Sequence, residues 1–247
     1  MLKTVQVIFL FTLLFSLISV SVTKAQTDWE FDASVYMWFA GIDGTVGLAN
    51  AEQQIDATPS DLLSNLELAL PLHFEIRNQQ VSIIADVLYM GLGQTVDVQV
   101  TTPHNTFANT AEMDMDQWVV EGAFGFRVSE VFEILLALRY YDLSVSMVID
   151  DAAPSKTENW YDGFIGARYK TDFAKDWYTA IRADIGMGGS DFAWYGDATV
   201  GYRFSQLFSL TFIYRVISLD YETGSGIDYF KYDTFNHGFG LGAVFTF

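Results

Sequence analysis

Residues 236–247, NHGFGLGAVFTF, alternate in side-chain character along the end of the chain. Odd positions from His237 to Phe247 are mostly large and apolar, whereas even positions such as Gly238 and Gly242 are small or weakly polar. A period of two places alternate side chains on opposite faces of a strand. The tail therefore predicts a β-strand with one apolar face and one small face that ends on an aromatic residue.

The start of the chain predicts export. Lys3 forms a short basic start, residues 5–20 are almost wholly apolar, and Ala25 closes a small-residue pattern typical of a cleavage site. The apolar stretch is shorter than the roughly 20 residues that a transmembrane helix needs. We expect residues 1–25 to be a cleaved signal peptide and residues 26–247 to form a single domain.

The charge balance narrows the classes of partner. The chain has 31 acidic and 13 basic residues, of which Lys3 and Lys24 lie in the predicted signal peptide. Residues 26–247 therefore carry 31 acids against 13 − 2 = 11 bases, a formal charge of −20. This balance argues against a nucleic-acid partner, whose phosphates need a basic surface. The absence of cysteine excludes disulfides and thiol catalysis.

Four hairpin-like units recur along the chain. Their short polar turns lie at residues 78–80, 128–130, around Asp172 and at 205–206, whereas longer polar connections lie near 101–110, 150–157, 188–191 and 223–226. Tight turns of this kind join antiparallel strands. Short turns that alternate with long loops are typical of outer-membrane barrels, whose short turns face the periplasm.

These patterns predict an all-β fold: a transmembrane antiparallel up-and-down β-barrel of about ten strands, with eight or twelve strands as the alternatives. The predicted strands span residues 28–40, 65–77, 80–98, 111–127, 131–149, 158–170, 176–187, 193–204, 207–221 and 229–247. We expect residues 41–64 to form a long first loop that folds over the mouth or into the lumen. Within it we expect a hairpin and a helical turn, with Thr58 as the cap and Pro59 in the first turn.

The strand at 65–77 separates two environments. Leucine, phenylalanine and isoleucine occupy its even positions, whereas Glu67, His73, Glu75 and Arg77 occupy odd positions. A charged side chain at mid-bilayer on the lipid face costs about 2–4 kcal/mol, so the odd face must point into the lumen. Pro71 lacks an N–H group, and we expect a bulge there.

The same alternation of inward and outward positions along the other strands predicts a lumen with nearly balanced charge. It holds eight bases and six acids, namely Arg77, Arg127, Arg139, Arg168, Lys170, Arg182, Arg203, Arg215, Glu75, Asp86, Glu121, Asp162, Asp184 and Asp197. Interleaved charges in a narrow barrel favour an ion-pair network that fills the interior. A narrow conduit and a ligand pocket are the alternatives.

Candidate catalytic residues are few. His73, Ser82 and Asp86 are the residue types of a hydrolase triad and are expected in one lumenal region, although interior polar groups are the simpler interpretation. His104 is predicted in an external loop and His237 on the lipid-facing side. The acidic run at residues 113–116 lacks the glycine and distal glutamate of a calcium loop. We therefore assign no catalytic, cofactor-binding or metal-ligating residue.

Taken together, the export signal, the dyad strands, the sequence GYRFS at residues 201–205 and the terminal Phe247 resemble small Gram-negative outer-membrane β-barrels of the OmpA-like or opacity-porin-like kind. Residues 38–44, WFAGIDG, also resemble the opening of proteobacterial outer-membrane barrels that have no assigned activity. The resemblance implies a location in the outer membrane, with outer-membrane lipids and the barrel-assembly machinery as partners. It implies no cofactor and leaves open a small-molecule or surface ligand and the oligomeric state.

The expected function is non-enzymatic: a structural, surface-interaction or limited small-solute passage role. The alternative is an outer-membrane barrel enzyme that acts on lipids or peptides.

Overall fold

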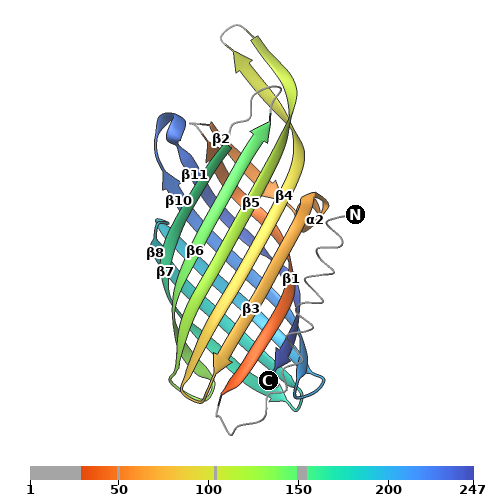
Figure 1. The fold of residues 1–247 in the computed structure, drawn as a ribbon, viewed down its shortest axis with the longest axis vertical. Helices are drawn as coiled ribbons and strands as arrows, with labels where there is room; N and C mark the ends of the chain where they lie inside the picture. The colour runs from red at the N-terminus through yellow and green to blue at the C-terminus, as the bar shows by residue number, and fades with distance from the viewer. Residues whose placement is uncertain (1–28, 49–50, 103–104, 149–154) are drawn as a thin grey trace.

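The chain folds into one antiparallel sheet that closes on itself as a barrel (Figure 1). The computed structural model describes residues 29–48, 51–102, 105–148 and 155–247, so the predicted signal peptide lies outside the described residues. The strands are β1 (Glu30–Leu48), β2 (Ala51–Ala57), β3 (Leu66–Arg77), β4 (Val81–Thr102), β5 (Asn105–Arg127), β6 (Phe132–Val148), β7 (Ser155–Ala174), β8 (Trp177–Gly188), β9 (Phe192–Arg203), β10 (Phe208–Thr223) and β11 (Phe230–Thr246). β1 and β3–β11 form the ring of ten, which confirms the predicted strand count.

The predicted tail strand closes this ring. β11 pairs with β1 without interruption from Thr246 opposite Asp32 to Phe230 opposite Leu48. The small residues of the tail allow the strands to approach, since a Cβ atom on Gly238 would overlap the backbone oxygen of Phe39. The start of β1 and the end of β11 lie at the same end of the barrel as the short turns, as an even number of strands requires (Figure 1).

Side chains alternate between an apolar outer belt and a largely polar lumen. Leu136, Leu138 and Ile165 point outward and are each more than half exposed, whereas Glu121, Arg139 and Asp162 point inward and are buried. A membrane solvates the outer belt and satisfies none of its backbone groups, so only a closed strand ladder can cross it. The predicted separation of lipid-facing and lumenal faces is confirmed.

Residues 41–64 differ from the expected loop. β1 runs on to Leu48, and β2 pairs with it from Ala57 opposite Ile42 to Ala51 opposite Leu48. The expected hairpin is therefore present, but it extends the barrel wall instead of covering the mouth or entering the lumen (Figure 1). The physical reason is β11, whose outer half needs a paired neighbour and finds it in residues 42–48.

The expected helical turn is also present as α2 (Pro59–Asn65). Thr58 caps it: the Thr58 hydroxyl oxygen accepts a hydrogen bond from the Asp61 N–H at 3.4 Å, and the Thr58 N–H donates to the Asp61 carboxylate at 2.9 Å. This reciprocal pair is a capping box. Among the described residues, no helix is long and apolar enough to cross a membrane. A 3₁₀ turn, η1 (Gly226–Asp228), lies between β10 and β11.

Two further expectations are wrong. The predicted loop at 101–110 is a strand hairpin, because β4 and β5 stay paired out to Thr102 opposite Asn105 and rise beyond the rest of the barrel (Figure 1). Its polarity indicates a loop, yet its four threonines and Phe107 favour strands. The expected bulge at Pro71 is absent, since the β3–β4 register runs unbroken through Pro71 and shifts only between Leu66 and Leu68.

An arginine on the outer belt should destabilise the barrel most at the middle of the bilayer and least near its surfaces. Leu138 stands 138 − 132 = six positions along β6 from Phe132, near the middle of the roughly 9–11 residues that span a membrane. We expect Leu138→Arg to lower the free energy of unfolding in lipid vesicles by about 2–4 kcal/mol, and the matched Val131→Arg in the adjacent turn by about 0–1 kcal/mol. Urea titration followed by tryptophan fluorescence measures both. Equal effects at the two positions would contradict the assigned faces and depth.

Candidate functional site

The half of the lumen near the short turns holds a chain of ion pairs drawn from several strands. Arg168 on β7 crosses the lumen to Glu75 on β3, with two hydrogen bonds of 2.8 Å, and also pairs with Glu133 on β6 at 2.6 Å. Arg77 pairs with Glu30 at 2.8 Å and also with Asp32. Because Arg168 joins strands on different sides of the barrel, this layer spans the lumen from β7 to β3.

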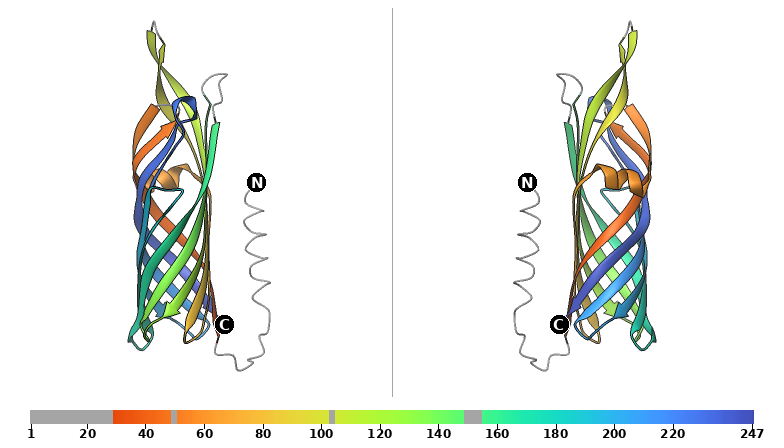
Figure 2. Two further views of the ribbon diagram at one scale, coloured as in Figure 1. Left: turned by 90° about the vertical axis from the view of Figure 1, so that its left-hand side faces the viewer. Right: turned by 90° about the vertical axis from the view of Figure 1, so that its right-hand side faces the viewer.

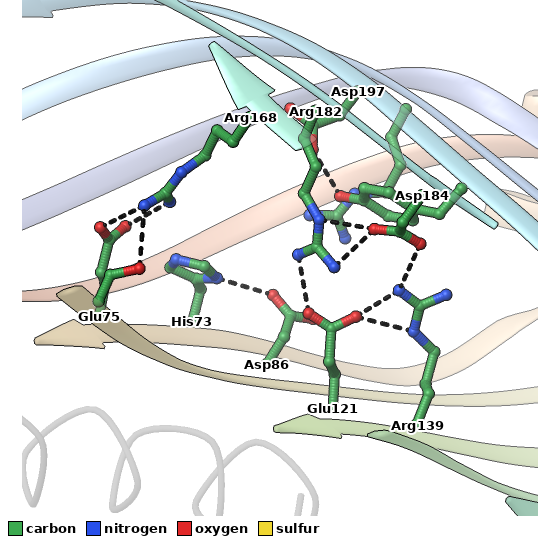
Figure 3. A network of polar contacts seen from close by, with 12 residues as sticks. His73, Glu75, Asp86, Glu121, Arg139, Arg168, Arg182, Asp184 and Asp197 are labelled. Atoms are coloured by element: carbon green, nitrogen blue, oxygen red, sulfur yellow. Dashed lines mark hydrogen bonds and ion pairs between the residues drawn. The ribbon is translucent and has the colours of Figure 1, made fainter. Parts of the chain in front are cut away.

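A second ion cluster lies farther along the lumen (Figure 3). Glu121 accepts hydrogen bonds from Arg139 (Nε, 2.8 Å) and from Arg182 (Nη1, 2.7 Å). Asp184 pairs with the same two arginines, at 3.3 Å to Arg139 and 2.7 Å to Arg182. All four side chains are buried, and two acids match two bases. Buried charges persist only when they are matched in this way.

The third group contains the predicted His73. Its Nδ1 lies 3.0 Å from the carboxylate of Asp86, whose other oxygen accepts the Tyr36 hydroxyl at 3.0 Å. Arg215 in turn donates to the Tyr36 oxygen at 2.7 Å. The expected neighbourhood of His73 and Asp86 is therefore confirmed, and both face the lumen (Figure 3).

The possible triad does not assemble, because Ser82 is directed elsewhere. Its hydroxyl donates to Glu133 at 2.6 Å and lies 3.5 Å from Arg168, so it belongs to the first ion-pair layer. A nucleophilic serine needs hydrogen-bond contact with its base. The geometry instead makes His73, Ser82 and Asp86 satisfied interior polar groups.

The half of the lumen near the long hairpins contains a cluster of aromatic side chains that was not predicted there. Trp160 stacks on Tyr221 with ring centroids 3.9 Å apart and on Tyr141 at 5.0 Å. Phe230 and Tyr232 are almost completely buried in the same cluster. The alternation of inward and outward positions along each strand places all five side chains in the lumen.

One small cavity of about 150 Å³ remains within the lumen, lined by Tyr36, His73, Asp86, Glu121 and Arg215 among others. The lumenal charges are also better balanced than expected. Asp32 and Glu133, both buried, were missed and raise the six predicted acids to eight, equal to the eight bases. Asp32 follows the parity of its strand and could have been found by extending the rule to the first strand.

The remaining candidates lie away from this lumen. His237 is on the outward face, as expected, with Nε2 3.2 Å from Asp43 and Nδ1 3.2 Å from the Tyr214 hydroxyl. His104 lies outside the described residues. Asp116 accepts a hydrogen bond from the Tyr89 hydroxyl on the outer side of the sheet. Within the described part of the chain, no group of three or more histidine and acidic side chains could hold a metal ion.

Comparison with known proteins identifies the fold. Neither a protein-family model nor a characterised protein sequence matches the chain. Among solved structures, the outer membrane protease OmpT from Escherichia coli has a TM-score of 0.52 at 10% identity, over 89% of this chain and 96% of that chain.

Two further solved structures are also similar. The translocator domain of the autotransporter NalP from Neisseria meningitidis has a TM-score of 0.47 at 11% identity, over 98% and 97% of the two chains. Ail, the attachment invasion locus protein of Yersinia pestis, has a TM-score of 0.39 at 9% identity, over 89% and 98%. At such low identity the likeness to OmpT shows the fold alone. Together with the apolar outer belt, this fold confirms the predicted outer-membrane β-barrel and its location in the outer membrane.

Glu121 should be a main determinant of lumenal stability. Glu121→Gln removes the charge that two buried arginines share, so we expect a loss of about 3–5 kcal/mol in the free energy of unfolding. The matched Glu130→Gln in an exposed turn should change it by less than about 0.5 kcal/mol. Urea titration in vesicles measures both variants. A Glu121→Gln protein as stable as the parent would show that the network is not a structural element.

Proposed function

We propose that the protein is a non-enzymatic, non-conducting outer-membrane barrel that acts through the surface it presents outside the cell. The observation that carries this proposal is the filled lumen. Two ion-pair layers, centred on Arg168 and Glu121, are followed by the stacked aromatic layer around Trp160. A ring of one charge sign around an open lumen would favour ion passage, whereas matched pairs across the lumen favour a plug.

The distribution of charge supports a role at the surface. Residues 26–247 hold 31 acids and 11 bases, and the lumenal set takes eight of each. The rest of residues 26–247 therefore has 31 − 8 = 23 acids against 11 − 8 = 3 bases, so the whole charge of −20 of these residues lies outside the lumenal set. Such a surface favours cationic partners and repels anionic ones. The long β4–β5 hairpin projects furthest from the barrel (Figure 1).

The enzyme alternative has less support. The His73–Asp86 pair lies between the Arg168 layer and the aromatic layer, beside a cavity of only about 150 Å³. A peptide or a lipid headgroup would have to displace one of these layers to reach it. The nearby serine is engaged with Glu133. The likeness to a protease at 10% identity adds nothing about activity.

Planar-bilayer recording tests the proposal. The purified barrel, inserted in a lipid bilayer in concentrated salt, should give no stable current steps, because no water-filled path runs through matched buried charges and stacked rings. Heat-modifiable migration on a gel should confirm that the inserted protein is folded.

An open bacterial porin recorded in the same bilayers provides the positive control. Reproducible single-channel steps from the folded barrel would overturn the closed-lumen proposal and favour the narrow conduit. Hydrolysis of a lipid or peptide that is lost in His73→Gln, while the folded fraction stays constant, would instead favour the enzyme.

A further inference from the structure

The barrel wall is interrupted between β1 and β3. On the edge of β1 that faces away from β11, β3 pairs with residues 30–35 and β2 pairs with residues 42–48. Residues 36–41 have no strand partner on this edge in the described sheet. α2, which connects β2 to β3, lies at the wall beside this interruption (Figure 2).

Backbone parity explains why the ladder stops there. Phe31 and Phe247 exchange backbone hydrogen bonds of 3.2 and 2.8 Å. The backbone N–H and C=O groups of odd residues of β1 therefore point to β11, and those of even residues, including Tyr36, point to β3. The Asn78 N–H donates to the Val81 oxygen at 2.9 Å. The backbone groups of even residues of β3 therefore point to β4, and those of odd residues point to β1. The observed register runs from Glu30 opposite Arg77 to Val35 opposite Leu72, and its next pair would join Tyr36 to Pro71.

Pro71 cannot complete that pair, because proline has no N–H to donate. This also explains why Pro71 needs no bulge with β4: its missing donor points to β1. The backbone groups of Tyr36 and Trp38 consequently point into the interruption without a strand partner. In hydrocarbon an unsatisfied backbone group is costly, so the N–H groups require an acceptor and the C=O groups a donor, from protein, water or a polar lipid group.

A cavity of about 650 Å³ occupies the interruption. Its lining includes the lumen-facing residues Tyr36, Trp38 and Leu88 together with the lipid-facing residues Met37, Leu68 and Leu241. The cavity therefore reaches side chains on both faces of β1 at the interruption. Tyr36 and Leu88 also line the small lumenal cavity, so the two spaces adjoin.

The chemistry of this opening fits a lipid chain. Nearly all of its lining is apolar, with Glu67 as the one charged residue, and its volume is within the roughly 300–1,000 Å³ of small-molecule sites. It adjoins the half of β3 far from the short turns, which faces the outer leaflet. We propose that the opening between β1 and β3 binds an acyl chain of a lipid from the surrounding bilayer. The ester or amide carbonyl of that lipid would accept from the backbone N–H groups of β1.

The proposal is independent of ion conductance, since the acyl chain enters from the side and the lumen stays filled. It predicts that a lipid chain reaches side chains on the lumenal face. The probe is a phosphatidylethanolamine with a photoactivatable diazirine near the end of one acyl chain, mixed into vesicles that contain the full barrel. Mass spectrometry then maps the crosslinked residues.

In the parent protein we expect crosslinks at Trp38 and Leu88, which face the lumen beside the opening. Lumen-facing Ala180 and Tyr195 on β8 and β9 should stay unlabelled, whereas lipid-facing Leu136 should be labelled in every sample. Labelling of Trp38 and Leu88 that does not exceed that of Ala180 and Tyr195 would overturn the proposal.

Two variants test the route. Pro71→Val restores a donor opposite Tyr36 and should extend the ladder, while Ala69→Phe fills the cavity without altering that ladder position. Either change should reduce labelling of Trp38 and Leu88 to the level of the opposite wall. The matched Ala85→Phe on the lipid face of β4 should leave labelling unchanged. Heat-modifiable migration restricts the comparison to folded protein, and persistent lumenal labelling in both closing variants would exclude entry through this opening.

Discussion

The structure depends on satisfying backbone hydrogen bonds where no water is available. A strand that crosses hydrocarbon must be paired on both edges, and a sheet achieves this only by closing. The seam between β1 and β11 provides the closure, with continuous pairing over residues 32–48 and 230–246. The alternating tail, with small residues such as Gly238 on its lumenal face, is the sequence that makes this close pairing possible.

Closure in turn fixes the position of the charges in the membrane-spanning part of the strands. Within the apolar belt, the charged residues of the strands can point only into the lumen, and a narrow lumen forces them together. Glu121, Arg139, Arg182 and Asp184 are the result, with each acid shared by two bases. Such a network tolerates no excess of either sign, so the large acidic surplus of the chain is confined to residues outside it.

The sequence predicts the features that repeat along single strands and misses those that depend on the third dimension. Strand number, facing and the capped helix at Thr58 follow from local patterns. The pair Glu121–Arg139 can also be predicted from the sequence, because the two residues are opposite each other on neighbouring strands. Arg168–Glu75, which joins β7 to β3, depends on the diameter and stagger of the barrel and has no local signal. Beyond the membrane the apolar alternation ends, and the outer half of β1 and the outer ends of β4 and β5 therefore resemble loops in the sequence.

Pro71 shows both what the sequence can predict and what depends on the arrangement of the strands. Its lack of a donor is visible in the sequence, and the expected consequence was a bulge against the following strand. The direction of the missing donor decides otherwise: it points to β1, so the β3–β4 ladder is intact and the β1–β3 ladder ends one pair earlier. Complete backbone pairing is thus absent between β1 and β3, and that place coincides with the cavity of about 650 Å³ and lies beside α2. A defect in pairing that is surrounded by apolar side chains has the properties of a binding site for a molecule that the membrane itself supplies.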